Sequence, residues 1–205
     1  MSRFTEREEF WLLTKVVKGG GGGGLPEGYT QLTYVSGSGS GYIPTGVYLA
    51  STDIVEAEFA NSSSTGYGAL YGSYKMGESS ALYGNQTYYG YDVANNKVDT
   101  NIAVDTSWHK AQHDFASGRL VIDGVVTEFT PFEFENTDEN YLLARYYNKS
   151  YGYYWKGSIR KYKVYRNGTL ISNLVPAQHG EDIGMYDLVR NEFLVGTNIT
   201  AGDPV

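Results

Sequence analysis

The sequence predicts an all-β protein, a two-sheet antiparallel sandwich that follows a short N-terminal helix and a glycine tether. From residue 25 onward, short apolar and β-branched runs alternate with Gly, Asn, Asp and Ser. No helical periodicity persists there beyond one or two turns. Many short strands at this spacing are typical of two packed sheets. A run of six glycines at 19–24 separates this domain, 25–205, from the segment before it.

The first 18 residues form the predicted helix. Thr5 and Glu8 have the spacing of a capping box, and the lysines at 15 and 18 suit the negative end of the helix dipole. We expect the apolar face to anchor the helix to another chain through Phe10, Trp11, Leu13 and Val17. Packing of the helix on its own domain is the alternative. Because polyglycine holds no direction, residues 19–24 uncouple the helix from the domain.

The strands are predicted by alternation and by turn residues. Residues 53–60 (DIVEAEFA) alternate an apolar face with a face that carries Glu56 and Glu58. Further strands are expected at 108–115, 119–122, 125–129, 141–147, 158–166 and 169–175. Asp123-Gly124 and Asn167-Gly168 predict tight hairpins, because a type I′ turn needs positive φ at both central residues. The small residues at 37–41 (GSGSG) predict a flexible loop.

Composition excludes several classes of protein. The chain has 205 residues and no cysteine, so disulfides and thiolate metal sites are absent. The net charge of −7 argues against a nucleic-acid partner. No apolar run is long enough for membrane insertion, and the acidic residues that precede the first apolar ones are atypical of a secretory signal. We expect no cofactor and no metal.

Several motifs of the domain share one family pattern: Trp108-His109-Lys110, GRLVIDG at 118–124, Leu142-Leu143-Ala144-Arg145 and Gly157-Ser158-Ile159. This pattern resembles the laminin-G-like, concanavalin A-like lectin and glucanase superfamily over residues 25–205. The resemblance implies a jelly-roll sandwich with one concave sheet. In that family, this face or its rim often binds glycans.

The ends of the domain resemble a narrower group: LPEGYTQL at 25–32, YIPTG at 42–46, NGT at 167–169 and IGMYDL at 183–188. They look like the form of the domain found in bacteriophage virion proteins and gut-bacterial surface proteins. The resemblance implies a virion protein, either a head fibre or decoration protein or a tail-associated one. We expect the helix to bind other virion proteins, the domain to bind a host cell-surface glycan, and the chain to form a homo-oligomer.

Tyrosines supply the candidate glycan site. The chain has 20 of them, gathered mainly at 67–91 and 146–154, and a tyrosine ring offers a flat apolar body with a hydroxyl at its rim. The alternative is cross-strand packing of the same rings. The glycan-binding candidates are Tyr88 and Tyr89 and, in a segment expected to be a loop, Tyr151, Tyr153, Tyr154 and Trp155.

Catalysis is not expected. A glycosidase needs two carboxylates, and Glu56 and Glu58 share a strand face, but the third carboxylate of the Glu-x-Asp-x-x-Glu-like strand in catalytic members of the family is missing. His109 and His113 fall about 13 Å apart along a strand, too far to chelate one metal. We therefore expect a non-catalytic lectin-like protein. A glycan-cleaving hydrolase of the same fold and a ligand-free structural decoration protein remain alternatives.

Basic residues gather between 145 and 166, where seven of the sixteen lie. This stripe predicts either contact with an acidic partner or an anionic glycan, or a solvated strand face with lysines at a sheet edge.

Overall fold

All of the regular structure is β. The computed structural model describes residues 24–205 except 65–66, 75–78, 86, 94–95 and 148–149, and these residues contain strands and turns without a helix. Within them no helical segment is long and apolar enough to cross a membrane. The predicted helix and all but the last glycine of the tether lie in residues 1–23, outside the described residues.

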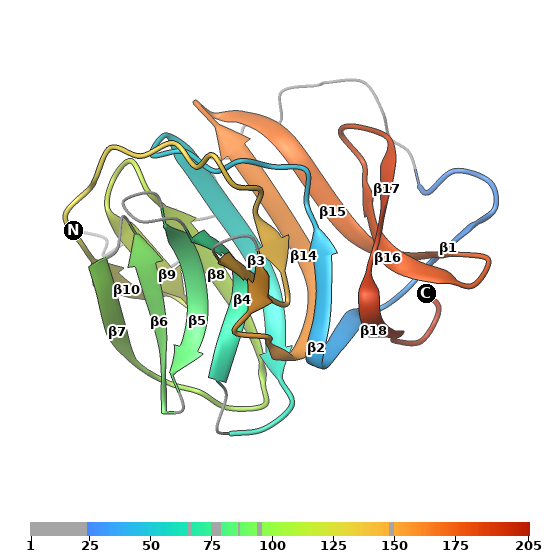
Figure 1. Ribbon diagram of the computed structural model, residues 1–205, viewed down its shortest axis with the longest axis horizontal. Coiled ribbons are helices and arrows are strands. Elements are labelled where there is room, and N and C mark those ends of the chain that lie inside the picture. The colour runs from blue at the N-terminus through green and yellow to red at the C-terminus, as the bar shows by residue number, and fades with distance from the viewer. Residues whose placement is uncertain (1–23, 65–66, 75–78, 86, 94–95, 148–149) are drawn as a thin grey trace, which may run out of the picture.

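The strands form two layers (Figure 1). The large sheet contains β1 (Tyr29–Gln31), β2 (Val35–Pro44), β3 (Asp53–Asn61), β8 (Trp108–Asp114), β9 (Arg119–Ile122), β10 (Val125–Glu128), β14 (Lys156–Arg166), β15 (Thr169–His179), β16 (Asp182–Asp187), β17 (Glu192–Val195) and β18 (Thr197–Ala201). The small sheet contains β4 (Tyr67–Tyr74), β5 (Ser80–Asn85), β6 (Tyr88–Val93), β7 (Asn96–Ala103), β11 (Tyr141–Leu142), β12 (Arg145–Tyr147) and β13 (Ser150–Gly152).

Strand β14 is the centre of the large sheet. It pairs along nearly its whole length with β3 on one side, and with β2 and then β15 on the other. From β3 the sheet continues through β8 and β9 to β10. Nearly all neighbours run antiparallel, whereas β12 lies parallel to β4. Strand β2 joins the two layers, because its last residues pair with β11 of the small sheet.

The predicted alternation at 53–60 and both predicted hairpins are confirmed. In β3, Val55, Ala57 and Phe59 are buried while Glu56 and Glu58 face outward. Asp123 and Gly124 have φ of 50° and 84°, and Asn167 and Gly168 have φ of 49° and 76°. These are the left-handed conformations that a type I′ turn requires, so the two turns fix the register of β9 with β10 and of β14 with β15.

Predictions for two segments, 37–41 and 141–147, are wrong. Residues 37–41 are not a loop but the middle of β2, where the glycines allow close approach. A Cβ at Gly37 would lie 3.0 Å from the carbonyl oxygen of Trp155, and one at Gly41 would lie 2.5 Å from that of Asn198. The predicted strand at 141–147 is interrupted, because Leu143 has a φ of 61° and separates β11 from β12.

Aromatic rings from both sheets fill the core. Phe59 of the large sheet meets Tyr89 of the small sheet edge-on at 5.4 Å between ring centroids, and Trp155 packs against both rings. Farther along the core, the hydroxyl of Tyr71 hydrogen-bonds Nδ1 of His113 at 2.9 Å. All five side chains are almost completely buried.

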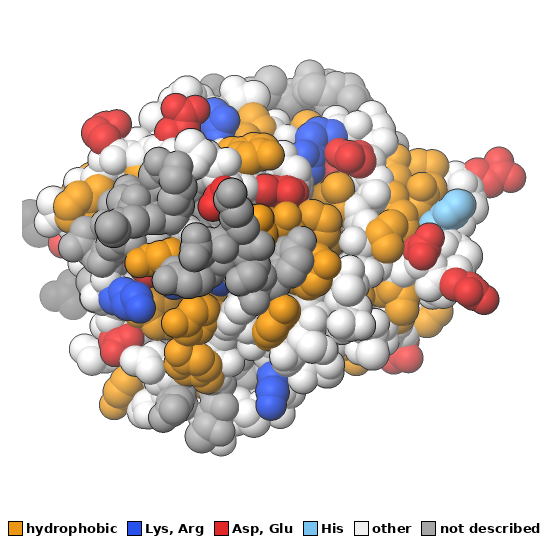
Figure 2. Space-filling model, in the orientation of Figure 1, with side chains coloured by type: hydrophobic (Ala, Val, Ile, Leu, Met, Phe, Trp, Pro, Cys, Tyr) orange, Lys and Arg blue, Asp and Glu red, His pale blue; other side chains and the backbone are white. Residues whose placement is uncertain are grey.

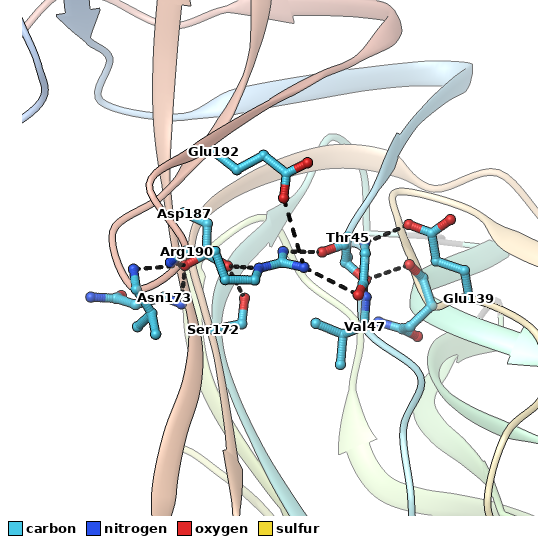
Figure 3. Close-up of polar contacts among 11 residues, drawn as sticks. Thr45, Val47, Glu139, Ser172, Asn173, Asp187, Arg190 and Glu192 are labelled. Carbon is cyan, nitrogen blue, oxygen red and sulfur yellow. Dashed lines mark hydrogen bonds and ion pairs between the residues drawn. The ribbon is translucent and has the colours of Figure 1, made fainter.

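A buried carboxylate ties the loop after β2 to the turn after β16 (Figure 3). Asp187 accepts hydrogen bonds from Ser172 Oγ at 2.7 Å and Arg190 Nε at 2.7 Å. The far side of the Arg190 guanidinium donates to the carbonyl oxygens of Thr45 and Gly46. The sequence motifs at 42–46 and 183–188, more than 130 residues apart, therefore meet through one arginine.

Truncating Trp155 should destabilise the fold strongly. The indole is completely buried between the sheets, and removing a large aromatic from a core costs about 3–5 kcal/mol of unfolding free energy. Urea unfolding of Trp155→Ala measures this loss. The matched control is Trp108→Ala, since that indole is 37% exposed and should cost much less. Equal losses in the two variants would contradict the core role of Trp155.

His113 should make the protein less stable in mild acid. Burial lowers the pKa of His113 from 6.5 to about 3, so between these values the unfolded chain binds a proton that the folded protein excludes. The stabilising contribution is complete above pH 6.5 and is lost as the pH falls toward 3. The unfolding free energy should drop by about 2 kcal/mol from pH 7 to pH 5.

Urea titrations at the two pH values test this expectation. The difference in unfolding free energy between pH 7 and pH 5 should mostly disappear in His113→Gln. It should remain in His179→Gln, which changes an exposed imidazole. An unchanged pH dependence in the His113 variant would overturn the assignment.

Candidate functional site

A small pocket opens on the outer face of the small sheet. Its volume is about 130 Å³, and it is lined by Tyr67, Gly68, Ala69, Tyr83, Gly84, Asn85, Lys97, Arg145 and Tyr153. These residues come from β4, β5, β7, β12 and the segment after β13. The face over β4 to β7 carries hydrophobic side chains beside isolated charged ones (Figure 2). The pocket thus combines aromatic walls with a few polar groups, which is typical of small-molecule sites.

Strand alternation places Tyr83 in the pocket wall. Its neighbour Leu82 is buried in the core, so the Tyr83 ring points to the opposite face of β5. Gly90 on the adjacent strand makes room for the ring. A Cβ at Gly90 would lie 2.8 Å from two atoms of the Tyr83 ring, so any larger residue would displace it.

Tyr67 and Tyr153 form the most exposed wall. Their ring centroids lie 5.8 Å apart, and the two side chains are 56% and 46% exposed. Gly68 lets the segment that carries Tyr153 approach β4, because a Cβ there would lie 2.3 Å from the carbonyl oxygen of Tyr154. Ala69 completes the contact by donating its amide N–H to the carbonyl of Tyr153 at 2.6 Å. Backbone contacts therefore hold together the two segments that carry these rings.

Arg145 lies beneath these rings and is only 5% exposed. Its Nη2 pairs with Asp92 Oδ2 at 2.9 Å, and Asp92 also accepts from Ser79 Oγ at 2.8 Å. The guanidinium carbon lies 4.0 Å from the Tyr74 ring centroid and 5.7 Å from that of Tyr153. Arg145 thus supports the aromatic wall, while the fully buried carboxylate of Asp92 balances its charge.

Polar groups line the opposite rim. Asn85 donates from Nδ2 to Asp99 Oδ2 at 2.8 Å, and Lys97 lies two residues before Asp99 on β7. Burial raises the pKa of the Tyr83 phenol, and the negative charges of Asp99 and Asp92 raise it further. Tyr83 therefore keeps its proton at neutral pH and remains a hydrogen-bond donor. The rim offers donors and acceptors side by side.

The predicted glycan-binding residues separate into different environments. Tyr153 lines the pocket, and Tyr154 is half-buried in a bridge with Ala69. Tyr88 is 41% exposed but does not line the pocket. Tyr89 and Trp155 are completely buried, so their rings are not available at the surface and serve the packing alternative. Tyr151 belongs to strand β13 and not to the expected loop, and its side chain lies outside the described residues.

The remaining pocket residues were not among the predicted ones. Tyr67 and Tyr83 belong to the first tyrosine cluster, and the alternation of Leu82 with Tyr83 is the signal that could have identified the outward ring. Asn85, Lys97 and Arg145 carry no such signal, because only the pairing of β4, β5, β6, β7 and β12 brings them together.

Of Glu56 and Glu58, the structure disfavours Glu58 as the general acid of a glycosidase. They lie on the outer face of the large sheet, where Glu58 pairs with Arg160 at 2.9 Å and Lys161 at 3.4 Å. Burial alone would raise the pKa of Glu58, but the hydrogen bond from Arg160 and the charges of the neighbouring Lys161, Arg160 and Lys110 lower it. A general acid of a glycosidase needs a raised pKa.

Four of the seven basic residues in the stripe at 145–166 pair with carboxylates. Besides Arg145, Arg160 and Lys161, Arg166 holds the buried Asp53 through two contacts of 2.8 Å. Arg160 and Lys161 share the single carboxylate of Glu58, and Lys149 lies outside the described residues. Among the described side chains, no group of three or more His, Asp and Glu residues could hold a metal ion.

Removing the charge of Arg145 should destabilise the protein. Arg145→Met would leave Asp92 buried without its cation, which costs about 3–5 kcal/mol of unfolding free energy. Arg160→Met provides the matched control, because that side chain is 40% exposed in its pair with Glu58 and exposed pairs contribute about 1 kcal/mol or less. Chemical denaturation measures both. A cost for Arg145→Met no larger than that of the control would contradict the supporting role of the buried pair.

Comparisons with known proteins show the fold. No protein-family model matches the chain, and no curated protein matches it. Among solved structures, it resembles a Bacteroides ovatus protein described as a "putative carbohydrate binding protein", with a TM-score of 0.57 and 13% identity over 85% of this chain and 62% of the other. It also resembles domains LG4-5 of the mouse laminin α1 chain, with a TM-score of 0.52 and 18% identity over 85% of this chain and 46% of the other.

The chain spans less than two thirds of the length of either of these structures. At such identities the likeness establishes the architecture and not an activity. The fold of the domain is a laminin-G-like β-sandwich.

Proposed function

We propose that this chain is a non-catalytic carbohydrate-binding module and that the pocket on the small sheet is its binding site. The observation that carries the proposal is the pair of exposed rings, Tyr67 and Tyr153, which converge at 5.8 Å beside a polar rim. A ring face packs against the C–H face of a sugar, while hydroxyl, amide and carboxylate groups bind its hydroxyls.

Close packing of the pocket walls favours binding of a weakly interacting ligand. Gly68 and Gly90 allow the backbone and Tyr83 contacts that shape the pocket, and the pair of Arg145 with Asp92 supports it from below. A rigid site avoids the entropy cost of ordering side chains upon binding. The carbohydrate-binding description of the Bacteroides ovatus protein is in keeping with this assignment.

We further propose that the module is displayed on a bacteriophage virion and attaches the particle to a host-surface glycan. This part rests on the sequence motifs at the ends of the domain and on the apolar residues Phe10, Trp11, Leu13 and Val17, which would bind other virion proteins. Many copies of the module on one particle, or a homo-oligomer, would place several pockets within reach of one cell surface.

The two alternatives make different demands on the molecule. A hydrolase needs a pair of carboxylates, of which the general acid has a raised pKa. The lowered pKa of Glu58 does not suit a general acid. A ligand-free decoration protein needs no pocket. This alternative assigns no function to the exposed rings of Tyr67 and Tyr153.

Replacing a pocket tyrosine should weaken glycan binding without unfolding the protein. Tyr67→Ala and Tyr153→Ala should each cost about 1–3 kcal/mol of binding free energy if the ring lies at the centre of the contact. Tyr48→Ala is the matched control, since that ring is 50% exposed and does not line the pocket. Binding to a panel of host and bacterial glycans, with melting temperatures of all variants, measures the effect.

Failure of the unmodified protein to bind any glycan, or equal affinity in the pocket variants and the control, would contradict the proposal. Release of reducing sugar that is lost in a Glu56→Gln, Glu58→Gln double variant would instead establish the hydrolase alternative.

A further inference from the structure

We infer that the pocket takes one neutral sugar residue at the end of a glycan chain and discriminates against acidic sugars. This inference rests on the proposed function and adds the class of ligand. Three properties of the pocket lead to it: its charge balance, the kind of hydrogen-bonding groups on its rim, and its size.

The charges of the pocket cancel. Arg145 and Lys97 are the cations in the lining, and two carboxylates lie behind it: Asp92 pairs with Arg145, and Asp99 accepts from Asn85. Asp92 is fully buried and holds Arg145 at 2.9 Å, so Lys97 is the one cation among the described pocket residues without such a partner. A carboxylate or sulfate entering here would lose water and meet Asp99. The attraction of Lys97 for an acidic sugar would be offset by the repulsion from Asp99, so the acidic group would gain no net attraction to compensate for its lost water.

The rim suits hydroxyl groups. A sugar hydroxyl donates one hydrogen bond and accepts others. Asp99 can only accept, Lys97 can only donate, and the amide of Asn85 can do both. Asn85 and Asp99 are already held together at 2.8 Å, so acceptor and donor groups lie side by side at a fixed spacing. Two neighbouring hydroxyls of a neutral sugar match this arrangement.

The volume limits the ligand to one residue. A volume of about 130 Å³ is small beside the roughly 300–1,000 Å³ of typical ligand pockets, and it accommodates the edge of a single sugar ring. Tyr67 and Tyr153 close one side, and Tyr83 lies in the wall as well. A chain that continued in both directions would need an open groove. We therefore assign the pocket to a terminal residue.

Matched sugar pairs test the charge preference. Calorimetric titration, or saturation-transfer NMR where binding is weak, is carried out with the methyl glycosides of glucose, galactose and mannose and with the uronic acid of each. We expect at least one neutral glycoside to bind about tenfold more tightly than its uronate. Its affinity should change less than about twofold when salt rises from about 50 to 500 mM, because no net charge is paired.

A charge variant tests the role of the rim. Asp99→Asn keeps the shape of the side chain, and it should weaken neutral-sugar binding about fivefold or more while reducing the discrimination against the uronate. Asp182→Asn, on the exposed start of β16, is the control and should change neither. Extending the glycan beyond the terminal residue should improve the affinity less than about threefold.

The outcomes separate the ligand class from the function. Tighter, salt-sensitive binding of a uronate that Tyr67→Ala abolishes would overturn the neutral-sugar inference and leave the carbohydrate-binding function intact. An affinity that rises more than about tenfold with chain length would overturn the single-residue assignment. If no neutral glycoside binds while acidic glycans do, the neutral-sugar inference is overturned. If only longer glycans bind, the single-residue assignment is overturned. Binding that no pocket variant changes would overturn the proposed function itself.

Discussion

The insertion of Trp155 between the two sheets is the contact on which both the core and the pocket depend. Its indole packs against Phe59 of one sheet and Tyr89 of the other, and its amide N–H donates to the carbonyl of Leu143 at 2.8 Å. Two residues earlier, Tyr153 lies on the outer surface beside Tyr67. The same short segment therefore closes the core with one ring and builds the pocket with another.

Glycines around this segment are a consequence of that insertion. A Cβ at Gly157 would lie 2.5 Å from the indole nitrogen of Trp155, and one at Gly37 would lie 3.0 Å from its carbonyl oxygen. The chain can pack so closely only where side chains are missing. This explains why sequence reasoning mistook 37–41 for a loop: the composition of a turn and that of a crowded strand are alike.

The sequence was sufficient where local rules decide the structure. The alternation in β3 and the hairpins at Asp123-Gly124 and Asn167-Gly168 depend on residues that are neighbours in the chain, and they were predicted correctly. The pocket was not predicted, because Arg145 and Lys97 come together only through pairing across the small sheet. Nothing local distinguishes Trp155, which is buried, from Tyr153, which is exposed.

We expect so small a site to bind its ligand weakly. Weak binding by one copy is a physical reason for the proposed display of many copies. A sugar residue of roughly a dozen heavy atoms, at about 0.3 kcal/mol per atom, gains about 4 kcal/mol, which corresponds to a dissociation constant near 1 mM. One such contact does not hold a particle to a cell. Linked copies convert later contacts into intramolecular ones, and the gain of about 10²–10⁴ needs no new chemistry in the pocket. A module whose small pocket binds weakly would therefore suit display in many copies, which is the role proposed for the tether and the apolar residues that precede it.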